Sequence, residues 1–181
     1  MFQIDLIEKC KNNDRKAQMK LYGQYCDGMF CVAMRFLKNT HDAEDAMQEA
    51  FIKAFQKIEQ FQGDVTFGAW LKRIVINTCL DVLKTQKEMW LELDETLTTI
   101  ADNDDDWNTE DDVTIDEVKQ AIMLLPEKYK IVVLLYLIEG YDHSEIAQIL
   151  NITEITSRTQ LRRGKSKLKE LLIREKNGTR S

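Results

Sequence analysis

The last third of the chain constrains the fold most, because residues 140–168 predict two short helices around a tight turn. Residues 144–150 place their apolar side chains on one side of a helix. Residues 151–153, Asn-Ile-Thr, supply turn residues, and a second helix is expected from Glu154. This order of elements is typical of a helix-turn-helix.

The second of these helices is basic. We expect Ile155, Leu161 and Leu168 to form its inward line. Five bases fall outside that line: Arg158, Arg162, Arg163, Lys165 and Lys167. A recognition helix reads base edges with its N-terminal residues, so we predict base contacts by Thr156, Arg158, Thr159 and Arg162. Arg163, Lys165 and Lys167, further along, are expected to contact phosphates. We expect His143, ahead of the first helix, to be a surface residue.

The rest of the chain is also predicted to be helical. Only 7 Gly and 1 Pro occur in 181 residues, which argues against a turn-rich β fold. We predict helices over residues 4–11, 15–38, 42–60 and 67–89, with Asp42 as the N-cap of the third. After residue 113, an apolar face and then Pro126 predict two more helices. The expected fold class is all-α.

Charge divides the chain into two helical domains. The net charge is −6, yet residues 92–117 hold twelve acids and no Lys or Arg, whereas residues 155–181 hold nine bases and two acids. We predict a flexible acidic linker over residues 91–112, joining domains at residues 1–90 and 113–181. The basic C-terminal domain fits a nucleic-acid partner despite the acidic average.

Several classes of function are disfavoured by the sequence. No run approaches 18 apolar residues and no signal peptide is recognisable, so we expect a cytoplasmic protein without membrane insertion. The four cysteines form no C-x-x-C pair and are expected to be reduced and mostly buried. Acids at positions 102, 104 and 106 imitate a calcium loop that lacks its Gly and Glu. We therefore expect no metal, no cofactor and no enzyme activity.

Two faces of the N-terminal domain carry polar residues at helical spacing. On the third helix Asp45, Gln48, Glu49 and Ile52 form one line, which suits docking onto a basic partner or else is a solvated face. On the fourth helix Arg73, Asn77, Leu80, Lys84 and Lys87 share a basic face that can follow phosphates. Strand separation requires unstacking of bases, and an Asn can bind the edge of an extruded base.

Three segments carry a resemblance to a known family. Residues 42–51 (DAEDAMQEAF) resemble the second conserved region of bacterial sigma factors, and residues 67–77 (FGAWLKRIVIN) resemble the promoter-reading segment that follows it. Residues 125–129 and 139–147 are similar to the promoter-distal domain of extracytoplasmic-function (ECF) sigma factors. The resemblance spans about 150 residues in the family's order, whereas an autonomous helix-turn-helix regulator, the alternative function, has no reason to carry the first block.

The resemblance implies a role for each part. The chain would bind core RNA polymerase and direct promoter-specific transcription initiation, with promoter DNA and an anti-sigma factor as further partners. Residues 1–90 would bind the polymerase through Asp45, Gln48, Glu49 and Ile52, and residues 113–181 would read the distal promoter element. The upstream edge of the melted element would contact Arg73, Asn77, Lys84 and the loop Gln62, Gly63, Asp64, Val65 and Thr66. Ser157 and Gln160 depart from the family's pattern inside the recognition helix.

Overall fold

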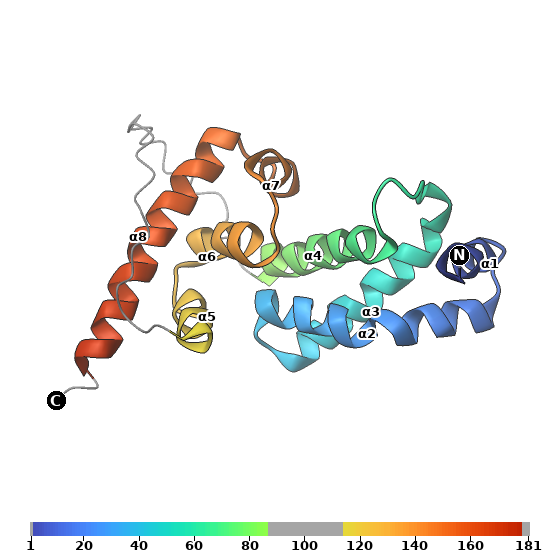
Figure 1. The fold of residues 1–181 in the computed structure, drawn as a ribbon, viewed down its shortest axis with the longest axis horizontal. Helices are drawn as coiled ribbons and strands as arrows, with labels where there is room; N and C mark the ends of the chain where they lie inside the picture. Colours follow the sequence, from blue (N-terminus) through green and yellow to red (C-terminus); the bar gives the residue numbers. More distant parts are fainter. Residues whose placement is uncertain (1, 87–113, 179–181) are drawn as a thin grey trace. The chain divides into compact units, whose positions relative to one another are not determined.

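The computed structural model describes residues 2–86 and 114–178, and divides the chain into two compact units, residues 1–91 and 92–181 (Figure 1). Every element within the described residues is a helix, so the predicted all-α fold with two helical units is confirmed. Residues 91–112, predicted to be a flexible linker, lie outside the described residues. No described helix is long and apolar enough to span a bilayer.

The N-terminal unit is built on three long helices that pack against one another. Its elements are α1 (Phe2–Lys11), α2 (Arg15–Leu37), α3 (Thr40–Gln56), the short 3-10 turn η1 (Ile58–Gln60) and α4 (Phe67–Gln86). Apolar side chains at three- and four-residue steps fill the centre, and Leu21, Phe36, Phe51 and Leu71 are almost wholly buried. Helix α1 packs against α2.

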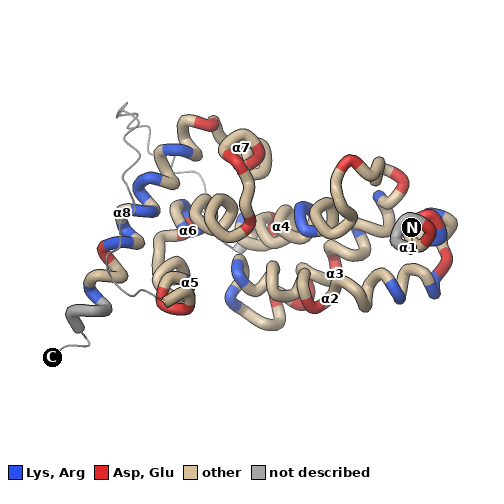
Figure 2. The backbone as a smooth tube through the Cα atoms, in the orientation of Figure 1, with Lys and Arg blue, Asp and Glu red and all other residues tan. Residues whose placement is uncertain are grey.

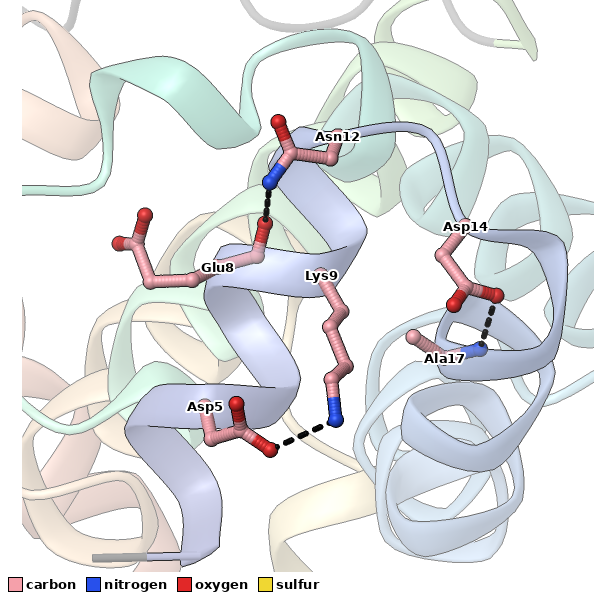
Figure 3. Close-up of polar contacts among 6 residues, drawn as sticks. All are labelled: Asp5, Glu8, Lys9, Asn12, Asp14 and Ala17. Carbon is pink, nitrogen blue, oxygen red and sulfur yellow. Dashed lines mark hydrogen bonds and ion pairs between the residues drawn. The ribbon is translucent and has the colours of Figure 1, made fainter.

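The helix junctions follow from capping side chains. Asp14 begins α2 by accepting a hydrogen bond from the backbone N–H of Ala17 at 3.2 Å, while Lys9 pairs with Asp5 at 2.9 Å on α1 (Figure 3). The N-cap of α3 is Asn39, so the prediction of Asp42 was wrong. Asn39 accepts bonds from two backbone N–H groups, and Asp42 lies instead in the first turn, where the helix dipole favours an acid.

The C-terminal unit is organised around one long helix, α8, against which the three preceding helices pack. Its elements are α5 (Ile115–Met123), α6 (Glu127–Val133), the π-helical segment η2 (Leu134–Ile138), α7 (His143–Leu150) and α8 (Glu154–Gly178). Sequence periodicity did not indicate the π turn, in which the N–H of Glu139 donates to the carbonyl of Leu134 at 2.9 Å.

Helices α6 and α8 approach each other closely. A Cβ added to Gly164 of α8 would lie 2.6 Å from Cγ2 of Val133, so only Gly fits at this crossing. On α6 the Lys130 side chain is 1% exposed, and its Nζ lies 2.6 Å from Oε1 of Glu127. The unit therefore depends on a close backbone approach and on a buried ion pair.

The cysteines are less buried than predicted. Cys10 and Cys79 are buried, Cys26 is half-buried and Cys31 is exposed, and all four are free thiols. Burial raises the pKa of Cys79 to about 12, which keeps this side chain a neutral thiol inside the core.

Candidate functional site

The predicted docking residues lie together on the outer face of α3. Asp45, Gln48, Glu49 and Ile52 are all exposed, and Ile52 retains 58% of its surface. The opposite face of α3 is buried in the core. The helix thus offers a partner two carboxylates and one apolar side chain on a rigid support.

Two bases that sequence reasoning missed hold the carboxylates of this face. His41 Nδ1 lies 3.2 Å from Asp45 Oδ2, and Lys53 Nζ lies 2.9 Å from Glu49 Oε1. A hydrogen bond with the backbone and the carboxylate of Asp45 raise the pKa of His41. Lys53 also donates to Thr78 Oγ1 of α4 at 3.5 Å, so it links Glu49 to the neighbouring helix. The signal was present in the sequence as two pairs at i and i+4.

The loop over residues 62–66 is anchored at both ends by aromatic rings. Phe61 precedes the loop and Phe67 follows it, with ring centroids 5.6 Å apart. Trp70 lies 5.5 Å from each of these rings, and Tyr25 of α2 lies 5.5 Å from Phe67. These rings consequently have a packing role, and they fix where the loop leaves and rejoins the unit.

The loop itself is exposed at all five positions. Gly63 has φ +86, a left-handed conformation that favours glycine. Thr66 begins α4, and its hydroxyl accepts a hydrogen bond from the N–H of Ala69 at 3.2 Å. Gln62, Asp64 and Val65 are therefore the side chains that the loop presents.

The predicted basic face of α4 is narrower than the spacing suggested. Arg73, Asn77 and Lys84 are exposed, but Leu80 is 2% exposed and belongs to the core. Lys87, the last residue of the predicted face, lies outside the described residues. Lys84 pairs with Asp81 at 3.6 Å, which partly offsets its charge. The exposed polar surface of this helix is therefore centred on Arg73 and Asn77.

In the C-terminal unit the predicted helix-turn-helix is confirmed as α7 and α8. Asp142 caps α7 in a reciprocal pair with Glu145, the two bonds measuring 2.8 and 3.0 Å. Asn151 closes α7 with a left-handed backbone at φ 54, and Thr153 caps α8 by accepting from the N–H of Thr156 at 3.1 Å. The turn is thus fixed at its first end by the backbone conformation of Asn151 and at its second end by the side chain of Thr153.

A hydrogen bond between α7 and α8 corrects the prediction that His143 is a surface residue. Ser157 is fully buried, and its Oγ lies 2.8 Å from Nδ1 of His143. His143 is half-buried rather than a surface residue, and its ring stacks on Tyr136 at 4.8 Å. Burial lowers the pKa of His143, and the nearby charge of Arg158 lowers it further, so the neutral imidazole is favoured. Ser157 is a packing residue of the recognition helix.

Lys and Arg residues recur along α8 (Figure 2). Arg158 and Arg162 are exposed, whereas Arg163 and Lys165 are half-buried. Lys165 lies 5.8 Å from the ring of Tyr136. The predicted base-reading residues Thr156 and Thr159 are also half-buried, and both hydroxyls are engaged within α8 and its cap.

Ser157→Ala is expected to lower the free energy of unfolding of the C-terminal unit by about 1 kcal/mol, because one intramolecular hydrogen bond is lost. Hydrogen exchange of α8 amides in the full chain measures the change. A double-mutant cycle with His143→Ala should show coupling, since each substitution removes the same bond. Thr159→Ala, which removes a hydroxyl bonded within α8, is the control that should show no coupling with His143. Additive effects of Ser157→Ala and His143→Ala would contradict the assigned bond.

Comparison with known proteins places both units in one class. Residues 21–88 match Sigma-70 region 2, and residues 115–168 match Sigma-70, region 4. The chain is 32% identical over 176 residues to the ECF RNA polymerase sigma factor SigW of Bacillus subtilis, covering 92% of this chain and 94% of the relative. It is 28% identical to the ECF RNA polymerase sigma-E factor of Escherichia coli, covering 88% of each. The chain belongs to the ECF RNA polymerase sigma factors.

Solved structures show the same fold. CnrH in complex with the cytosolic domain of CnrY has a TM-score of 0.56 at 22% identity, covering 92% of this chain and 94% of that one. RpoE in complex with the anti-sigma factor NepR, from Bartonella quintana, has a TM-score of 0.57 at 19% identity, covering 85% and 95%. The function expected from the sequence, a sigma factor that binds core RNA polymerase and directs promoter-specific transcription initiation, is confirmed.

Proposed function

We propose that the outer face of α3 is the surface through which this sigma factor binds core RNA polymerase. The observation that carries the proposal is the exposed line of Asp45, Gln48, Glu49 and Ile52 on a helix whose opposite face is core. Carboxylates favour a basic partner, and Ile52 adds apolar area at one end of the line. Lys53 limits the motion of Glu49, which reduces the ordering that binding requires.

The loop over residues 62–66 and α4 would bind the upstream edge of the melted promoter element. Anchoring of the loop by the aromatic rings supports this role, because a rigid loop can receive an extruded base without itself being ordered. Asn77 would hydrogen-bond the base edge, with phosphate contacts from Arg73 and Lys84. Thr66 would act through the position of α4, since its hydroxyl caps the helix.

The C-terminal unit would read the distal promoter element with α8. Arg158 and Arg162, both exposed near the helix start, are the proposed base-edge contacts, joined by Thr156 and Thr159. Arg163 and Lys165 would contact phosphates. The domain boundaries proposed from the sequence, residues 1–90, 91–112 and 113–181, assign these tasks to separate parts of the chain.

The family also supports a cytoplasmic, non-catalytic role. Sigma factors act on RNA polymerase and DNA, so the chain would work as a non-catalytic subunit that needs no cofactor or metal. RpoE of Bartonella quintana is in complex with an anti-sigma factor. By analogy an anti-sigma factor is the proposed inhibitor of this chain, with the polymerase-binding or DNA-binding faces as its targets.

The proposal is tested by mixing the purified chain with core polymerase and measuring co-elution and transcription from a genomic library. We expect co-elution, and transcripts that begin at a shared pair of promoter elements. Glu49→Lys should abolish co-elution, because it places like charge against a basic partner. Glu44→Lys makes the same charge change at an exposed position off the line and should leave co-elution intact. Equal binding by both variants would contradict the α3 assignment.

Asn77→Ala should separate binding from opening in the same assay. We expect normal co-elution and about tenfold fewer transcripts from duplex promoters, the equivalent of one lost hydrogen bond to a base. A template with the element already unpaired should recover most of the loss. Specific DNA protection by the chain without polymerase, and no co-elution, would favour the autonomous regulator instead.

A further inference from the structure

The rotation of α8 is fixed by its buried residues. The inward row is Ser157, Leu161, Gly164, Leu168 and Leu172, all buried at steps of three or four residues. Ser157 is held in this row by the 2.8 Å contact with His143. At 3.6 residues per turn, position 155 lies about 200° from position 157 around the helix. Ile155 therefore faces outward, and its predicted place in the inward line was wrong.

Ile155 retains 64% of its surface although it is a large apolar residue in the first turn of the recognition helix. Thr159 and Arg162 follow it on the same side at i+4 and i+7. The hydroxyl of Thr159 donates to the carbonyl of Ile155 at 2.9 Å, so its methyl group is what remains for a ligand. The outward side of the first two turns of α8 is thus apolar around Ile155 and the methyl group of Thr159.

Charged groups border this apolar area. Arg158 and Arg162 are exposed next to it, with Arg158 3.8 Å from the carboxylate of Glu154, and residues 155–181 carry nine bases against two acids. A ligand that fits must carry an anionic group beside an apolar one. The DNA major groove has these properties, because phosphates line its edges and the C5-methyl group of thymine projects into it.

We propose that Ile155 contacts the C5-methyl group of a thymine in the distal promoter element and so selects a T·A pair at one position. The inference rests on the proposed function, in which α8 reads that element. It adds a specificity residue that carries no hydrogen-bonding group. The readout at this position would come from apolar contact, while Arg158 and Arg162 read neighbouring bases or phosphates.

Replacing thymine by uracil tests the contact, because uracil removes only the methyl group. The holoenzyme is assembled from core polymerase and the full chain, and each thymine of the distal element, on either strand, is replaced singly in a promoter that the holoenzyme transcribes. Competition binding should show about a fourfold loss of affinity at one position, the equivalent of one buried methyl group. With Ile155→Ala, thymine and uracil at that position should bind equally.

Ile173→Ala is the matched control, since Ile173 is 51% exposed on the same helix five turns later. This variant should keep the full thymine preference. The inference is overturned if no uracil substitution weakens binding by the normal chain, or if the preference persists in Ile155→Ala. Footprinting separates this from failure of the proposed function: protection of the distal element with equal affinities overturns only the inference, whereas absence of protection overturns both.

Discussion

Glu127→Gln should lower the free energy of unfolding of the C-terminal unit by about 3 kcal/mol, because it leaves a buried ammonium without its carboxylate. The Lys130 side chain is 1% exposed and its Nζ lies 2.6 Å from Glu127. We place the effect at the low end of the range for buried pairs, since the Glu127 side chain is 27% exposed and the pair is only partly removed from solvent. Denaturant-dependent hydrogen exchange of the amides of α6 and α8 measures the loss.

The control for this prediction removes the buried charge as well. In the double variant Glu127→Gln, Lys130→Met an apolar side chain of similar length replaces the ammonium, and most of the stability should return. A salt-bridge deletion on the surface provides the contrast: Asp116→Asn, which removes an exposed partner of Lys119, should change stability by less than about 0.5 kcal/mol. If Glu127→Gln changed the stability as little as Asp116→Asn, the pair of Glu127 and Lys130 would not stabilise the unit.

Gly164→Ala should destabilise the C-terminal unit by about 2 kcal/mol, although alanine is the better helix former. The new Cβ would meet Val133 Cγ2 at 2.6 Å, and valine has little rotamer freedom in a helix with which to relieve the clash. Helices α6 and α8 would have to separate, and the recognition helix would move with them. Thermal unfolding measures the stability, and footprinting of the distal element measures the displacement.

Two comparisons isolate the clash from the general effect of alanine. At Gly28, on α2, an added Cβ would meet nothing within 4 Å, so Gly28→Ala should stabilise the chain by up to about 1 kcal/mol. Val133→Ala removes the clashing atom, and in the Gly164→Ala background it should recover stability rather than reduce it further. Additive losses in that double variant would contradict the assigned contact.

The sequence predicted those features that depend on spacing along one helix. The acidic line of α3, the exposure of Arg73 and Asn77, and the helix-turn-helix with its turn at Asn151 all follow from periodicity and turn chemistry. The pairing of Glu49 with Lys53 was equally readable at i and i+4 and was overlooked. Such features are local, so neighbouring residues contain the needed information.

The errors arose where a turn or a residue of another helix decides the outcome. Asp42 and Asn39 both have capping side chains, and the left-handed turn at Lys38 places Asn39 at the start of α3. Leu80 is buried by the packing of α4 in its unit, although the polar residues predicted to share its face are exposed. Ile155 was expected on the inward side of α8, which Ser157 occupies, because polarity along one helix did not reveal the bond between Ser157 and His143.

The sequence alone determined that this ECF sigma factor has two helical units, an acidic face in one and a basic recognition helix in the other. Periodicity fixes these features because a helix places residues three and four apart on the same side. Only the tertiary structure decided which side of α8 faces outward and how closely α6 approaches it. Those depend on the Ser157–His143 bond and on the space at Gly164, two contacts between helices that no single helix pattern contains.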